Sequence, residues 1–222
     1  FKQVKELGGS VNKGAKSIPL VYYKVSYYDT NGNEILEEVA KGMKKPKKKV
    51  LLKYYRVFNS ADVTGIEFAP LATFHSPNNF IEEADVLMKE MPNPPKVENG
   101  KPSYTPATDT IRVPKISQFD SASYYYHTFF HELIHATGHS ARLDRLEVTE
   151  VEEFGSLTYS QEELVAEIGA AYLCRFIGIL ETEMLENSAS YIAHWLEKLQ
   201  NDNRFVFQAA RKAKEACQYI LQ

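Results

Sequence analysis

The chain has 222 residues, of which 44% are hydrophobic and 25% charged, and its formal net charge is −3. This composition is typical of a globular protein with a real core, and it excludes a disordered or collagen-like chain. No apolar run reaches the ~18 residues of a membrane span, and no signal-peptide pattern opens the chain. We therefore expect a cytoplasmic protein without a membrane partner.

Charge is unevenly distributed along the chain. Residues 1–65 contain 13 Lys and Arg against 6 Asp and Glu, whereas residues 66–222 contain 13 against 23. A basic first part joined to an acidic second part predicts two domains with different tasks, which we place at residues 1–66 and 67–222. The first residue is Phe1 rather than Met, so we expect the N-terminal domain to lack its start.

The first part is predicted to be rich in β-structure. Residues 18–28 are β-branched and aromatic, and the Asp-Thr-Asn-Gly turn at 29–32 predicts that residues 34–39 pair back. The lysine-rich residues 41–49 predict an exposed loop. Residues 50–58 predict a further strand.

The second part is predicted to be rich in helix. Residues 92–106 contain several prolines and predict a loop, and residues 109–113 predict a short strand. Apolar residues recur with helical spacing at 78–91, 117–137, 160–179, 182–200 and 204–221. The predicted fold class is therefore α+β, with a small basic β-rich domain followed by a helix-rich domain.

The most specific motif is His-Glu-Leu-Ile-His at residues 131–135. One helical turn separates His131 from His135, so both imidazoles can bind one Zn²⁺. Glu132 lies beside them and can take a proton from the attacking water. The motif predicts a zinc hydrolase; two structural histidines on a buried helix are the alternative.

A catalytic zinc needs a third protein ligand, and the helix predicted at 160–179 offers acidic side chains. These are Glu162, Glu163 and Glu167, of which Glu163 and Glu167 are four residues apart and share a face. One of the pair can bind the metal while the other accepts an N–H bond from an imidazole. A capping box with Ser160 is the alternative role for Glu163.

Two more histidines continue the spacing of four residues on either side of the motif. His127 is a rival metal ligand. His139 follows Gly138 and is expected to tune the site or bind substrate, with a plain helix-end histidine as the alternative. The metzincin subclass is excluded, because the position where it needs a third histidine is Ala141.

Substrate contacts are less well defined by the sequence. We expect the strand at 109–113 to be an edge strand that pairs with an extended peptide. Arg142, Arg145 or Tyr159 could stabilise the oxyanion, and the sequence does not distinguish among them.

The runs at 131–145 and 162–171, with residues 7–14, 57–59 and 109–114, resemble the ArdC-type antirestriction proteins of plasmids and mobile elements. The resemblance spans nearly the whole chain. It implies a single-stranded-DNA-binding domain followed by a zincin-like metallopeptidase domain, with a role in protecting DNA from restriction. The Glu-x-x-x-Glu order also resembles the ligand helix of thermolysin-like gluzincins, which implies that Glu163 binds zinc and Glu167 orients an imidazole.

Basic and aromatic side chains are interleaved in the first part, a pattern typical of single-stranded-DNA grooves. The alternative is that the tyrosines are core residues and the lysines ordinary surface charge. The candidate DNA-binding residues are Lys13, Lys16, Lys24, Lys53, Arg56, Tyr22 and Tyr54.

The sequence therefore predicts a gluzincin-type zinc peptidase with a single-stranded-DNA-binding domain, acting on an unknown peptide or protein. The alternative is a DNA-binding protection protein whose metal site is structural. Glu132 favours hydrolysis, because a structural site needs the histidines but not the carboxylate between them.

Overall fold

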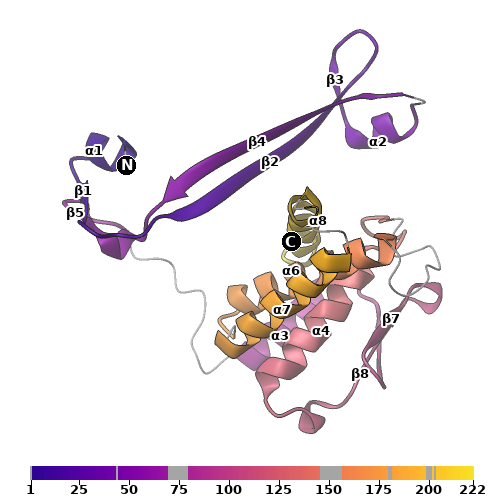
Figure 1. Ribbon diagram of the computed structural model, residues 1–222. Coiled ribbons are helices and arrows are strands. Elements are labelled where there is room, and N and C mark those ends of the chain that lie inside the picture. The colour runs from indigo at the N-terminus through magenta and orange to yellow at the C-terminus, as the bar shows by residue number, and fades with distance from the viewer. Residues whose placement is uncertain are drawn as a thin grey trace. The chain divides into compact units, whose positions relative to one another are not determined.

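The computed structural model describes residues 2–43, 45–69, 80–145, 157–179, 182–198, 202 and 204–222. The chain divides into two compact units, Phe1–Ala72 and Thr73–Gln222, and each is described by itself (Figure 1). The sequence-based boundary at residue 66 lies shortly before this division.

The first unit is built on a long two-stranded ribbon. Strands β2 (Ile18–Tyr28) and β4 (Lys47–Val57) pair antiparallel along their whole lengths. At one end of the ribbon, β3 (Glu34–Ile35) pairs with β2, and α2 (Glu37–Lys41) follows. At the other end lie α1 (Lys2–Glu6), the paired strands β1 (Ser10–Val11) and β5 (Val63–Thr64), and the 3₁₀ turn η1 (Ser60–Asp62).

The strand predicted at 18–28 is confirmed, and the loop predicted at 41–49 is exposed as expected but is wrong at both of its ends. Lys41 ends α2, and Lys47–Lys49 belong to β4. Lys44 lies outside the described residues. The prediction failed because it assumed that a strand must bury side chains. Both strands of this ribbon are largely open to water, where lysines are well tolerated.

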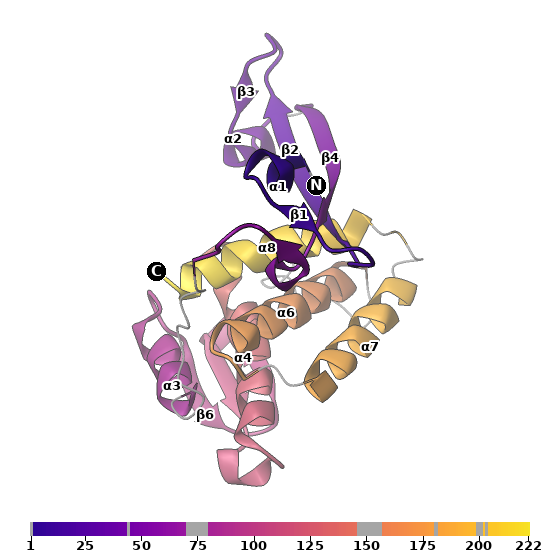
Figure 2. The same cartoon turned by 90° about the vertical axis from the view of Figure 1, so that its left-hand side faces the viewer.

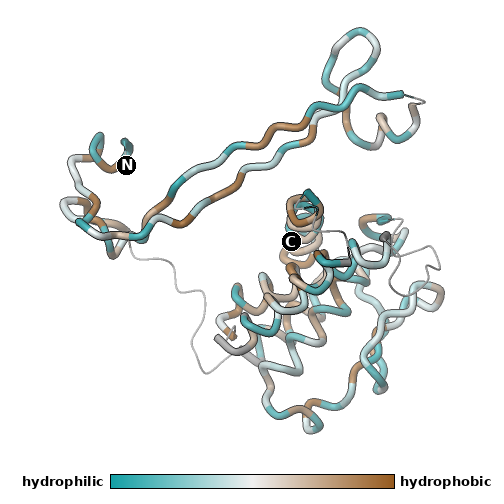
Figure 3. The backbone as a smooth tube through the Cα atoms, in the orientation of Figure 1, coloured by the Kyte–Doolittle hydropathy of each residue, from teal (hydrophilic) through white to brown (hydrophobic). Residues whose placement is uncertain are grey.

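The first unit has very little core of its own. Within its described part, Ala40 is the only buried hydrophobic side chain. Figure 3 shows hydrophobic and hydrophilic residues interspersed along both strands of the ribbon. Its arrangement therefore depends mainly on backbone pairing and cross-strand contacts.

The second unit combines five described helices with a small sheet. The helices are α3 (Phe80–Glu90), α4 (Ala122–Thr137), α6 (Leu157–Phe176), α7 (Thr182–Lys198) and α8 (Arg204–Ile220). Helix α4 packs against the sheet and against α6, and α6 also packs against α7 and α8 (Figure 2). The helices expected in this part of the sequence are confirmed, with ends shifted by a few residues.

The sheet contradicts two expectations. It contains β6 (Lys96–Asn99), β7 (Ser103–Thr105) and β8 (Thr110–Val113), with the 3₁₀ turns η2 (Pro106–Thr108) and η3 (Ile116–Gln118) beside β8. The region predicted as a loop thus holds two strands, which are too short to show alternation. Strand β8, expected at an edge, is central: it pairs parallel with β6 and antiparallel with β7. Strand β7 is the edge that lies against α4.

The core of the second unit forms where α4, α6 and α8 meet. Phe129, Phe130 and Ile134 of α4 are buried there with Leu164 and Leu173 of α6. No helix in the described ranges is both long and apolar enough to cross a membrane.

Candidate functional site

The two motif histidines lie on α4 with their rings turned toward each other. The helix begins at Ser121, whose side chain accepts a hydrogen bond from the Tyr124 N–H, and it ends at Gly138. The Nε2 atoms of His131 and His135 are 3.2 Å apart. Helical spacing alone therefore brings two metal-binding nitrogens together.

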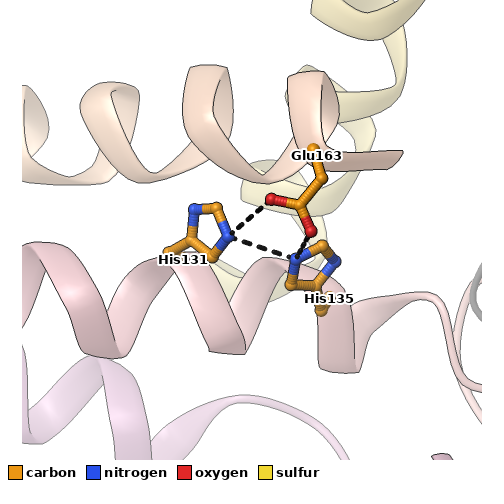
Figure 4. Close-up of side chains that lie close together, drawn as sticks. All are labelled: His131, His135 and Glu163. Atoms are coloured by element: carbon orange, nitrogen blue, oxygen red, sulfur yellow. Dashed lines mark hydrogen bonds and ion pairs between the residues drawn. The ribbon is translucent and has the colours of Figure 1, made fainter. Parts of the chain in front are cut away.

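The third donor comes from α6, which runs beside α4. Glu163 places Oε2 3.4 Å from His131 Nε2 and Oε1 3.5 Å from His135 Nε2 (Figure 4). Within the described part of the chain, these three residues form the one group suited to hold a metal ion.

The spacing of the donors fits a divalent ion. A tetrahedral zinc with bonds of about 2.0–2.1 Å separates its ligand atoms by about 3.3–3.4 Å. The two nitrogens are 3.2 Å apart, and each lies 3.4 or 3.5 Å from its nearer Glu163 oxygen, so the separations are close to that value. Two imidazoles and one carboxylate are also the donor set of many catalytic zinc sites. The protein thus has a divalent-metal site, and its donors suit zinc.

Two alternatives from the sequence are excluded. Ser160 lies inside α6, which already includes Leu157, so Glu163 is not part of a capping box at the helix start. The rival ligand His127 directs Nε2 at Ser188 Oγ, 3.1 Å away, and at Glu167, 3.6 Å away. It is not among the three clustered donors.

Each ligand imidazole has its own carboxylate behind it. Glu167 Oε2 is 3.4 Å from His131 Nδ1, and Glu162 Oε1 is 3.3 Å from His135 Nδ1. An Nδ1–H that donates to a carboxylate leaves the Nε2 lone pair facing the metal. The sequence predicted for Glu167, but not for Glu162, the role of accepting a hydrogen bond from a histidine. Glu162 comes one residue before Glu163 and therefore points about 100° away from it around the helix, where it reaches the second histidine.

The acidic neighbours create a field that favours positive charge among the donors. Burial lowers the pKa of both histidines, but hydrogen bonds that His131 donates to Glu163 and Glu167 raise its pKa to about 10. Hydrogen bonds that His135 donates to Glu162 and Glu163 raise its pKa to about 9. Burial would raise the pKa of Glu163, yet the two histidines hold it well below its usual value. A bound divalent cation would supply the positive charge that these acidic groups favour.

Glu132 is buried beside the three donors. It is 7% exposed, and burial raises the pKa of its carboxyl, opposed by the charges of His135 and His131. The Tyr104 N–H of edge strand β7 bonds to the same carboxylate. A carboxylate of raised pKa, held next to a metal site, is suited to accept a proton from water.

The two arginines proposed for the oxyanion are both occupied within the protein. Arg142 bonds to Asp109, to the Tyr104 hydroxyl at 3.2 Å, and to the carbonyls of Ala136 and Asn93. Arg145 bonds to Glu162, Thr137 and Ile134. The Tyr159 hydroxyl does reach the site, where it bonds to Glu163.

His139 does not join the described contacts of the metal site. Its Nδ1 accepts the Ala141 N–H at 3.1 Å, in the turn that follows α4. In these contacts it acts as a helix-end histidine, the simpler of the two readings of the sequence.

The register of the β2–β4 ribbon sorts the candidate DNA-binding residues by face. Successive side chains alternate between faces, and directly paired residues share one. Tyr22 pairs with Lys53, so these two and Lys24 lie together, whereas Tyr54 and Arg56 lie on the opposite face. We call the first the lysine face, formed by Ile18, Leu20, Tyr22, Lys24, Ser26, Tyr28, Lys47, Lys49, Leu51, Lys53, Tyr55 and Val57. The apolar face comprises Pro19, Val21, Tyr23, Val25, Tyr27, Lys48, Val50, Leu52, Tyr54 and Arg56.

Not all the candidates belong to the ribbon. Lys13 and Lys16 are exposed in the segment between β1 and β2. Lys24 forms an ion pair with Glu34 at 3.0 Å. The side chains of Tyr22 and Tyr55 on the lysine face are about half exposed, which leaves ring area open to a ligand.

Both units match known families. Residues 82–212 match the family described as zincin-like metallopeptidase. Residues 1–58 match the N-terminal domain of the anti-restriction factor ArdC. Among solved structures, the Mn(II)-bound antirestriction ArdC protein from the R388 plasmid is 31% identical, with a TM-score of 0.62, and the match covers 100% of this chain and 74% of that one. The metal-free structure of that protein gives a TM-score of 0.61.

Related sequences occur within longer proteins. The chain is 30% identical to the uncharacterized protein y4eC of Sinorhizobium fredii, over 99% of this chain and 69% of y4eC. It is also 33% and 32% identical to two DNA primase TraC proteins of Escherichia coli. It spans only 15% and 21% of their lengths.

Proposed function

This chain belongs to the ArdC-type antirestriction family, with an ArdC-type N-terminal domain ahead of a zincin-like metallopeptidase domain, and from that premise we propose that it is a zinc-dependent peptidase that also binds single-stranded DNA. Its role would be to protect mobile DNA from restriction. The first unit, Phe1–Ala72, would bind the DNA, and the second unit, Thr73–Gln222, would hydrolyse a peptide or protein.

The burial of Glu132 next to the metal donors is the observation that supports hydrolysis. A structural metal site is satisfied by its ligands, and a buried carboxylate of raised pKa next to it would only cost stability. Here the carboxylate is buried beside all three donors and is held by the Tyr104 N–H. Such an arrangement is explained if Glu132 handles protons during a reaction.

In the proposed reaction, His131, His135 and Glu163 would hold the cation. When bound, the cation would polarise the scissile carbonyl and make water a better nucleophile. Glu132 accepts the proton of the attacking water on its carboxylate and then delivers it to the departing amine nitrogen. The Nδ1 bonds to Glu162 and Glu167 keep both imidazoles in one orientation throughout.

Substrate placement would use β7 in place of the strand first expected. Strand β7 is the sheet edge against α4, and Tyr104 lies directly beside Glu132. An extended peptide that pairs along this edge would bring its carbonyl toward Glu132. The Tyr159 hydroxyl would donate to the developing oxyanion, because burial and Glu163 raise its pKa and keep it protonated.

The test compares Glu132→Gln with His135→Ala in the full chain. Metal content and cleavage of a quenched-fluorescent peptide library are measured for both. We expect Glu132→Gln to keep about one Zn²⁺ per chain but lose cleavage, because a general base contributes about 10²–10⁴-fold. His135→Ala should lose both. Wild-type protein that binds zinc and cleaves nothing would favour the alternative of a structural metal in a DNA-masking protein. Equal cleavage by Glu132→Gln would contradict the role of Glu132 as the general base.

The lysine face supports the DNA-binding part of the proposal. It combines Lys24, Lys53 and two further lysines of β4 with the half-exposed rings of Tyr22 and Tyr55. Lysines beside open aromatic rings can follow a phosphate backbone while unpaired bases stack. The apolar face carries fewer charges, so it serves as an internal comparison.

The DNA test therefore compares the two faces in the full-length protein. Tyr22→Ala with Lys53→Ala changes the lysine face, and Tyr54→Ala with Arg56→Ala changes the apolar face. The first pair should weaken single-strand binding by about 1–3 kcal/mol per lost stacked base. It should also reduce the salt slope by about 0.7 per lost phosphate contact. Equal losses from the two pairs, or equal affinity for duplex and single strands, would contradict the proposal.

A further inference from the structure

Arg145 is buried beneath the metal site, although it lies outside the motif and binds no metal. It is 7% exposed, and all three of its side-chain nitrogens donate hydrogen bonds within the protein. Nη2 donates to the Ile134 carbonyl at 2.7 Å and Nη1 to Thr137 Oγ1 at 2.7 Å. These two bonds satisfy groups at the C-terminal end of α4, where helix carbonyls lack partners.

The remaining N–H groups of Arg145 hold a carboxylate from the other helix. Nε donates to Glu162 Oε2 at 3.1 Å and Nη2 to Glu162 Oε1 at 2.6 Å. This two-point contact fixes the plane of the carboxylate as well as its position. Glu162 is itself only 4% exposed, so it has little freedom to turn elsewhere.

The clamped carboxylate then reaches a metal ligand. Glu162 Oε1 is 3.3 Å from His135 Nδ1, on the side of the imidazole away from the donor cluster. A hydrogen at Nδ1 leaves the lone pair of Nε2 aimed at His131 and Glu163. The contacts form one chain from Arg145 through Glu162 to His135.

We propose that Arg145 is a positioning residue for the metal ligand His135 and that it acts through Glu162. The guanidinium fixes the carboxylate, and the carboxylate fixes the tautomer and the ring plane of the imidazole. Lysine cannot replace it, because one ammonium group does not reproduce the two parallel bonds. The inference concerns metal affinity and holds whether or not the site hydrolyses peptides.

Arg142 provides a matched control from the same turn. Its guanidinium is also buried and also bonds to a carbonyl of the last turn of α4, that of Ala136 at 2.6 Å. It clamps a carboxylate too, that of Asp109. The described contacts of Asp109 do not include a metal donor, so Arg142 has the structural features of Arg145 without its connection to the metal.

The experiment measures the Zn²⁺ Kd of the full chain by competition with a chromophoric chelator, and thermal unfolding in the presence of EDTA. Arg145→Lys and Glu162→Gln should each weaken zinc binding by about 10–100-fold. The double variant should be little worse than either, because both changes break one chain of contacts. Arg142→Lys should lower the unfolding temperature but leave Kd within about twofold of wild type.

Two further measurements separate positioning from general damage. Thr137→Val removes one hydrogen bond of Arg145 but leaves its contact with Glu162, so the Zn²⁺ Kd should stay unchanged. This variant provides the comparison if Arg145→Lys fails to fold. Imidazole ¹⁵N spectra of the zinc-loaded protein should show a shifted Nδ1–H signal at His135, and an unchanged one at His131, in Glu162→Gln, because only the acceptor of the His135 Nδ1–H is changed. Equal shifts in Kd for Arg145→Lys and Arg142→Lys, additive effects of Arg145→Lys and Glu162→Gln, or an unchanged Nδ1–H signal at His135 would overturn the proposal.

Discussion

Gly169→Ala tests whether the close approach of α6 to α4 sets the spacing of the metal donors. The added Cβ would lie 2.7 Å from Ile134 Cδ1, 2.8 Å from Cγ1 and 3.2 Å from Cγ2. Ordinary carbon contacts begin near about 3.5 Å, so one side must yield by about 0.7 Å or more. Ile134 is fully buried among core residues, so turning its side chain would displace close-packed neighbours. We therefore expect α6 to move away from α4.

The expected sizes of the changes in stability and in metal affinity decide which of the two should be measured. Overpacking costs about 1–3 kcal/mol. Replacing a helical glycine by alanine returns about 0.5–1 kcal/mol. The net loss of stability is thus about 0–2.5 kcal/mol, a range that includes no change at all. Metal affinity is the sharper readout, because α6 carries Glu163 and α4 carries both histidines. An added separation of about 0.7 Å would exceed the spacing that a tetrahedral ion tolerates.

The assay is the Zn²⁺ Kd of Gly169→Ala, with thermal unfolding measured in parallel. We expect Kd to rise by about tenfold or more, as for other disturbed metal surroundings. The control is Gly169→Ala combined with Ile134→Ala, which removes all three crowded carbons. This double variant should recover much of the affinity even though the smaller side chain lowers stability. Wild-type affinity in Gly169→Ala alone would refute the view that helix spacing sets the donor geometry.

Three further outcomes are expected. Glu163→Ala should lose stoichiometric zinc in metal analysis, whereas Glu167→Ala should weaken binding by about 10–100-fold and still load at high zinc; unchanged metal content in Glu163→Ala would remove it from the ligand set. Saturation with zinc at about 1,000 times Kd should raise the free energy of unfolding by about 4 kcal/mol in calorimetry, and EDTA should reverse the gain. Burial would raise the pKa of Asp109, but Arg142 and Tyr104 hold it below its usual value. Its contribution to stability is therefore full above about pH 4 and is lost as the pH falls through the lowered pKa. In Asp109→Asn the free energy of unfolding should therefore fall less steeply as the pH is lowered below about 4. If it falls as steeply as in the wild type, the Asp109–Arg142 ion pair does not contribute to stability.

The parts of the site that follow from local spacing could be predicted from the sequence. His131 and His135 are one turn apart on any helix, and the next predicted helix offers a carboxylate from Glu163 or Glu167. The choice of Glu163 as the ligand comes from the resemblance to the gluzincin ligand helix, because spacing alone leaves both residues open. The clamp on Glu162 could not be predicted in this way. It depends on the path of the turn after α4, where Asp144 adopts a positive φ of 48° and directs Arg145 back under the helix. That path is a property of tertiary packing.

The ribbon illustrates the same limit in the first unit. Its composition predicts strands, but which lysines and tyrosines share a face depends on the register between β2 and β4. The register is set across an intervening strand and helix, β3 and α2, and not by a tight turn. The sequence therefore could not separate Tyr22 from Tyr54, which the pairing places on opposite faces.

The described residues of the first unit bury almost no side chains, and this affects how the unit behaves over time. Ribbons of two strands without a core are marginally stable, and their amide hydrogens exchange through local opening. We expect the amides of β2 and β4 to exchange with solvent orders of magnitude faster than those of α4 and α6. A ligand that binds the ribbon would slow that exchange, and part of its binding free energy would be used to order the strands. Affinity for such a ligand would then be lower than its contacts suggest, and release would be correspondingly quick.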